Sequence, residues 1–231
     1  MHHFSEFDPT QTLATNIAAK LRQRIACGEL APGTKLRLDE LRATFGVSLS
    51  PLREALSRLC AEGFVATQDQ RGYSVVPVSS SDLDEVMRLR CEFESYALRE
   101  SIRLGDDAWE GNVAAALHRL KKLERGQPAE EGGVDSWEQS HSVFHRTLVS
   151  ACNMPLLLHF CSTLHDLNDR YRRIFLWENA IDRDVRKEHE DICNATLERR
   201  ADDACALLRN HIERTAANVL RKLVSIEAGQ T

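Results

Sequence analysis

The sequence lacks any apolar run close to the roughly 18 residues that a membrane-spanning helix needs, so we expect no membrane span. It also lacks a C-x-x-C pair, although it contains seven cysteines. An odd, dispersed set of cysteines without a signal peptide is typical of a reducing compartment. We therefore expect a cytoplasmic protein in which most cysteines act as small buried hydrophobes.

The chain has no excess of basic residues, since its 231 residues carry a formal net charge of −5. Residues 1–76 are net +1, whereas residues 77–231 are net −6. This balance excludes a protein that binds polyanions over its whole surface. Any contact with DNA must use a localised basic face, which dimerisation would double.

The segment from residue 36 to residue 73 predicts two helices, a tight turn and a hairpin. Gly46 supplies the backbone angles of a sharp turn between the helices. Ser50 is the expected N-cap of the second helix, and Pro51 is expected at its first position, where a missing N–H costs nothing. Gly63 ends that helix. The first helix buries a face with i, i+3, i+7 spacing, formed by Leu38, Leu41 and Phe45.

The second helix of this segment presents polar side chains suited to DNA. Arg is the side chain that bonds guanine bidentately, whereas serines and helix N-terminal N–H groups more often hold phosphates. An alternative is that Arg53 and Arg58 form only a solvated helix face. The predicted DNA-contacting residues, including the wing tip, are Ser48, Ser50, Arg53, Ser57, Arg58, Arg71 and Gly72.

The same segment resembles the winged-helix domain of the GntR superfamily of bacterial transcription regulators. Upstream, the run GELAPG at residues 28–33 matches the family's G-x-L-x-P-G turn. The resemblance covers roughly the first third of the chain and implies double-stranded operator DNA as a partner. The residues that carry it are Gly46, Val47, Ser48, Pro51, Arg53, Glu54, Ala55, Leu56, Leu59, Gly63, Arg71 and Gly72.

Two positions depart from the pattern of that family. Leu49 and Asp39 stand where family members usually carry Arg. In FadR-type members both positions read bases or phosphates, and Arg53 alone remains of that set here. We infer an altered operator, or a weaker dependence on direct readout, and not a loss of DNA binding.

Beyond the linker at residues 77–81 the strand signals vanish, and helical spacing continues to the end of the chain. Ser81 or Asp82 is expected to cap the first of six or seven helices. The predicted fold is therefore mostly α: a winged helix-turn-helix domain at residues 12–76, after a loose N-terminal tail at residues 1–11, followed by an all-α helical bundle at residues 82–231.

Four histidines of the second domain could close around one divalent metal. His141 and His145 are four residues apart, so they project from one face of a helix. His189 and His211 lie in two other predicted helices. The alternative is that these are surface or hydrogen-bonded core histidines. The other histidines of this half, His118, His159 and His165, have no such partners and are interpreted as ordinary.

The second domain resembles the FCD domain, the all-helical effector and dimerisation domain of FadR-type GntR regulators. The three family histidines map onto His145, His189 and His211, and the family's Asp maps onto His141. An all-imidazole set favours zinc, nickel or copper over manganese or magnesium, and we expect zinc or nickel. It leaves the charge of the ion uncompensated, so an anionic effector could complete the shell. Alternatively, His141 swings away and the metal is weakly bound or lost.

Arg90 matches a position of the first FCD helix that often faces the cavity. Its guanidinium could pair with an effector carboxylate. The alternative is a structural salt bridge to Glu94 or Asp84.

These features together predict a homodimeric transcription regulator. We expect a repressor, because repression is the commoner action in the family that the chain resembles. A small-molecule effector, expected to be an organic acid, would bind beside the metal and alter operator affinity. One alternative is a regulator whose effector is the metal ion itself. Another is a metal-dependent hydrolase, but the sequence has no HExxH or nucleophile motif, and Glu188 and Glu190 point away from His189 on a helix. We therefore expect no enzyme.

Overall fold

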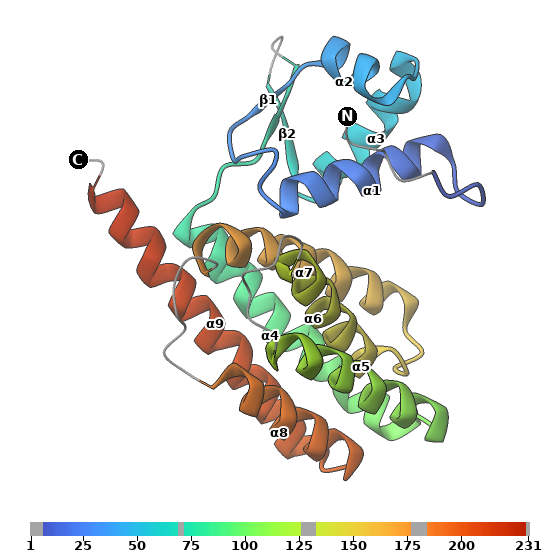
Figure 1. Cartoon of the computed structure of the whole chain (residues 1–231), viewed down its shortest axis with the longest axis vertical. Helices are drawn as coiled ribbons and strands as arrows, with labels where there is room; N and C mark the ends of the chain where they lie inside the picture. The colour runs from blue at the N-terminus through green and yellow to red at the C-terminus, as the bar shows by residue number, and fades with distance from the viewer. Residues whose placement is uncertain (1–6, 69–71, 126–132, 177–183, 230–231) are drawn as a thin grey trace. The chain divides into compact units, whose positions relative to one another are not determined.

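The computed structural model describes residues 7–68, 72–125, 133–176 and 184–229. The chain forms two compact units (Figure 1). The first contains Met1–Val78 together with Asp169–Ile174, and the second contains the rest. The boundary after Val78 falls within the predicted linker at residues 77–81.

The first unit is a helix-turn-helix with a small antiparallel sheet, ordered β1-β3-β2 in the described residues. The apolar faces of α1 and α3 pack on each other, and Phe64 lies fully buried at the entry to β2. This core anchors α3, the second helix of the motif, against α1. The elements are α1 (Leu13–Ala26), β1 (Lys35–Leu36), α2 (Leu38–Phe45), α3 (Leu49–Ala61), β2 (Val65–Gln68) and β3 (Gly72–Val75).

The turn between α2 and α3 contains the predicted glycine. Gly46 has φ 66°, in the left-handed region, and its N–H donates to the carbonyl of Arg42 at 2.9 Å. This left-handed residue ends α2 and satisfies one of its last carbonyls.

The start of α3 was predicted wrongly. Ser48, not Ser50, is the N-cap residue, and its side chain makes no capping hydrogen bond. Pro51 therefore stands third in the helix. The first-turn N–H groups of any helix lack an intrahelical acceptor, so Pro is tolerated throughout that turn and does not fix the first residue.

Residues 7–11 are the described part of the predicted N-terminal tail. The Asp8 N–H donates to the Asn16 side-chain oxygen at 3.0 Å, and the Asn16 amide donates back to the Asp8 carbonyl at 2.9 Å. This pair of bonds ties residue 8 to helix α1. At the other end of the unit, Arg71 lies outside the described residues.

The regular structure in the described part of the second unit is entirely helical, as predicted (Figure 1). Helix α4 lies along α9, α5 packs on α6, and α8 packs on α9. None of the described helices is both long and apolar enough to cross a bilayer. The helices are α4 (Ser80–Leu104), α5 (Asp107–Arg125), α6 (Gly133–Val149), α7 (Pro155–Leu176), α8 (Val185–Leu197) and α9 (Ala201–Gly229).

The cap of α4 also differs from the prediction. Ser79 is the N-cap, and its hydroxyl accepts a hydrogen bond from the Asp82 N–H at 3.1 Å. Ser81 and Asp82 are already inside the helix. Ser79 has an extended backbone, which leaves its hydroxyl free to reach the third helical N–H.

Candidate metal centre and effector cavity

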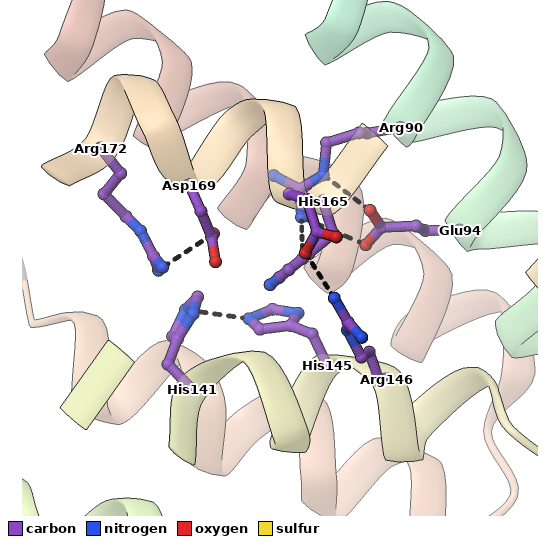
Figure 2. A network of polar contacts seen from close by, with 9 residues as sticks. Arg90, Glu94, His141, His145, Arg146, His165, Asp169 and Arg172 are labelled. Atoms are coloured by element: carbon purple, nitrogen blue, oxygen red, sulfur yellow. Dashed lines mark hydrogen bonds and ion pairs between the residues drawn. The ribbon is translucent and has the colours of Figure 1, made fainter. Parts of the chain in front are cut away.

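Four buried histidines meet in the second unit. His141 and His145 come from α6, His189 from α8 and His211 from α9. One ring nitrogen of each lies within 4.8 Å of those of the other three. The structure therefore brings together all four residues of the predicted metal set, and Figure 2 shows two of them, His141 and His145, from close by.

The spacing of these imidazoles suits a transition metal. The Nε2 atoms of His141 and His145 are 3.1 Å apart. Two nitrogens bound to one tetrahedral zinc at about 2.0–2.1 Å would be about 3.3 Å apart. The ring centroids of His189 and His211 are 4.9 Å apart, so a small inward movement would bring them into the same shell.

The chemistry of the donor set also fits a metal. Burial lowers the pKa of His145 well below its ordinary value, and His211 and His165 lower it further by charge repulsion. His145 is thus neutral, the form that carries a lone pair for coordination. Its Nδ1 has no hydrogen-bond partner among the described residues. Buried imidazole nitrogens are the donors that zinc and nickel prefer.

A carboxylate lies directly behind the cluster. An oxygen of Glu188, in the first turn of α8, is 2.8 Å from Nδ1 of His211. The other oxygen is 2.7 Å from the guanidinium of Arg214. Helical geometry predicted only that Glu188 diverges from His189, and it gave no sign that Glu188 contacts His211 of α9.

Arg90 forms the ion pair that the sequence offered as an alternative. Its guanidinium is 2.6 Å from the Glu94 carboxylate, and both side chains are buried. It also lies 3.3 Å from Nδ1 of His165 (Figure 2). Asp84, the other partner considered, pairs with Arg88 instead.

His165 was missed as a site residue. It is buried, and its ring centroid lies 5.5 Å from that of His145 and 6.0 Å from that of His141. The one available signal was its place on the face of α7 that also carries the buried Cys161 and Leu164. Helical spacing could predict that this face of α7 is buried, but it could not predict which helix packs against it.

A cavity of about 220 Å³ adjoins the cluster. Burial raises the pKa of the Cys161 thiol to about 12, so this side chain lines the cavity as a neutral group. The volume is below the roughly 300–1,000 Å³ of pockets for drug-sized molecules, which limits the cavity to small ligands. Its lining residues are Glu94, His145, Arg146, Val149, Ser150, Leu158, Cys161, Ser162 and His165.

The predicted DNA-contacting residues are in the first unit. Arg53 is exposed on α3 and has no ion pair among the described residues. Arg58 is exposed but is held by Glu54 at 2.5 Å and by Thr15 at 2.8 Å. The other exposed members of the set are Ser48, Ser50, Ser57 and Gly72, and Arg71 lies outside the described residues.

Both parts of the chain match models of known families. Residues 13–75 match the family described as "Bacterial regulatory proteins, gntR family". Residues 85–214 match the FCD domain.

Curated relatives match over most of their length. The chain is 38% identical to the uncharacterized HTH-type transcriptional regulator BphR of Paraburkholderia xenovorans, over 88% of this chain and 83% of the relative. It is 34% identical to the HTH-type transcriptional repressor GlaR of Escherichia coli, over 83% and 89% respectively. Among solved structures, a GntR family member from Pseudomonas syringae matches with a TM-score of 0.58 and 27% identity, over 98% of this chain and 92% of that one.

Proposed function

The chain belongs to the GntR family of bacterial transcription regulators, with an FCD domain, and we propose that it is a repressor controlled by a small organic acid. Members of this family are regulators and not enzymes, so the hydrolase alternative is dropped. The observation that carries the proposal is the buried cluster of four histidines beside a small cavity. The organic acid would bind there and change the affinity of the first unit for its operator.

We propose a divalent transition metal, zinc or nickel, held by His141, His145, His189 and His211. When bound, the ion supplies a Lewis-acidic positive charge. Four neutral imidazoles do not compensate that charge, so a small carboxylate is the natural further ligand. The mixed lining of the cavity supports such a ligand, because imidazoles stand at one part of it and Val149 and Leu158 can cover a short apolar chain.

Arg90 is the proposed effector-binding residue. Its guanidinium neutralises Glu94, a carboxylate in the cavity wall that would otherwise repel an anion. Where that ion pair opens, the guanidinium can bond the effector carboxylate directly.

DNA binding is assigned to the start of α3 and to the wing. Arg53 is the proposed base-reading side chain, because it is exposed and Arg bonds guanine bidentately. Ser48, Ser50 and Ser57 would contact the phosphates. Arg58 would have to break its ion pair with Glu54 before it could contact DNA. We therefore propose that Arg58 contributes less to DNA affinity than Arg53.

We propose that the protein acts as a homodimer through the second unit, so that two recognition helices can read a two-fold operator. A face of α4 and the start of α7 supports this, because it carries exposed apolar side chains. Tyr96 is 50% exposed and Phe160 is 45% exposed. Phe93 contacts Phe160, with ring centroids 6.1 Å apart, which joins the two helices in one apolar surface.

A direct metal sensor is the second candidate, because the four-histidine set could bind an ion without any organic ligand. Measurements of operator binding distinguish the direct metal sensor from the repressor controlled by an organic acid. A labelled DNA fragment selected from a random-sequence library would be titrated with the protein after chelation, after zinc addition, and after zinc plus a panel of small carboxylates. A response to one carboxylate at fixed zinc supports the proposal. If chelation and zinc addition alone switch operator binding on and off, the protein is a direct metal sensor.

A further inference from the structure

Glu188 occupies a position from which it can act on the metal without touching it. Its carboxylate oxygen lies 2.8 Å from Nδ1 of His211. With Nδ1 directed at that carboxylate, the Nε2 edge of the ring faces the cluster. A hydrogen bond from the second ring nitrogen to a carboxylate is the usual way in which a metal-binding imidazole is oriented.

The negative charge of this carboxylate can offset part of the positive charge of a bound ion. The four clustered groups are imidazoles, which bring no negative charge to a divalent ion. Glu188 is largely buried, with 13% of its side chain exposed, so solvent screens its charge weakly. It is also in the first turn of α8, where the helix dipole favours a carboxylate.

Arg214 holds the opposite side of the same carboxylate. Its guanidinium is 2.7 Å from the second Glu188 oxygen and is 47% exposed. Because Arg214 is partly in solvent, it fixes the carboxylate while cancelling only part of its field. The order from solvent inward is therefore Arg214, Glu188, His211 and the cluster.

We propose that Glu188 is a positioning residue of the metal centre: it orients His211 and supplies part of the negative charge that the imidazole ligands lack, and the rest is left for the effector carboxylate. This inference depends on the metal site proposed above. Glu188 would thereby take over part of the charge compensation that a directly bound carboxylate provides, although Glu188 does not itself bind the ion.

The test compares three variants of the full-length protein with wild type. Glu188→Gln keeps an oxygen that can accept from Nδ1 but removes the charge, and Glu188→Ala removes both. Glu190→Gln is the matched control, because Glu190 is two residues away on α8 and pairs with Lys121 and Arg186. Zinc affinity would be measured by competition with a chromophoric chelator, and Co²⁺ binding by its visible absorption spectrum.

We expect Glu188→Gln to weaken zinc binding about 10-fold and Glu188→Ala up to about 100-fold, while Glu190→Gln matches wild type. The Co²⁺ spectrum should stay unchanged in Glu188→Gln and shift in Glu188→Ala as His211 turns. Circular dichroism would verify that each variant is folded.

Equal zinc affinity in wild type and both Glu188 variants overturns the inference and leaves the metal site standing. A loss in Glu188→Ala alone overturns the charge role. No zinc binding by wild type overturns the proposed metal function and this inference with it.

Discussion

Single residues separate the two proposed activities of this protein, DNA binding and metal binding. Arg53 is exposed in the first unit, whereas His141 is buried in the second. Arg53 takes no part in the core of its unit, and a replacement of His141 by the similarly polar Asp keeps a buried side chain at that position. Mutations at these two positions therefore test DNA binding and metal binding one at a time.

Arg53→Ala should reduce operator affinity, because it removes the proposed bidentate contact to guanine. We expect a loss of about 1–3 kcal/mol in specific binding, measured by fluorescence anisotropy on the selected DNA fragment. Arg103→Ala is the control, because it removes an exposed arginine from the second unit. Unchanged affinity in Arg53→Ala would refute the assignment of Arg53 as a base-reading residue.

His141→Asp would restore the carboxylate that related FCD domains carry at this position. A hard oxygen ligand favours manganese over zinc more than an imidazole does. The ratio of manganese to zinc affinity should therefore rise in the variant, as measured by competition for one chelator. The four-histidine assignment fails if this ratio stays at the wild-type value.

At the scale of elements, the ends of the helices decide how the motif is built. Gly46 ends α2 with φ 66°, and an added Cβ there would meet no atom within 4 Å. Gly111 lies within α5 in similarly open space, without a positive φ. The two glycines thus differ in backbone conformation and not in crowding.

Replacing each of these glycines by alanine should give effects of opposite sign. Gly46→Ala places a Cβ on a left-handed residue and should lower the free energy of unfolding by about 1–2 kcal/mol. Gly111→Ala restricts the unfolded chain and should raise it by about 0.5–1 kcal/mol. Urea unfolding monitored by circular dichroism measures both. A stabilised Gly46→Ala would show that the left-handed turn is not required.

The sequence predicted the elements of the first unit well, because apolar periodicity and Gly46 are local signals. It misplaced the start of α3, because a proline is accepted at several positions of a first turn. It also predicted the four-histidine set, helped by the i, i+4 spacing of His141 and His145. It did not predict His165 or Glu188, because their roles arise where separate helices meet and no local pattern encodes that meeting.

For the whole molecule, the operator and effector proposals both depend on two copies acting together. One recognition helix contacts one half-site, and a two-fold operator needs a second helix at a fixed distance. A ligand in the second unit can change that distance only if the second units associate. In the proposed dimer, regulation would therefore depend on the apolar surface of α4 and α7.

Tyr96→Glu combined with Phe160→Glu should produce a monomer, because two buried charges without partners would oppose association. We expect sedimentation to show half the wild-type mass. Operator binding should be weaker than in wild type, because each monomer brings only one recognition helix to the DNA. Both side chains are about half exposed in the single chain, so the folded monomer should keep its helical content and its zinc affinity. Val224→Glu, at another exposed apolar position on α9, serves as the control and should remain dimeric. A dimeric double variant would mean that the subunits meet through a different surface.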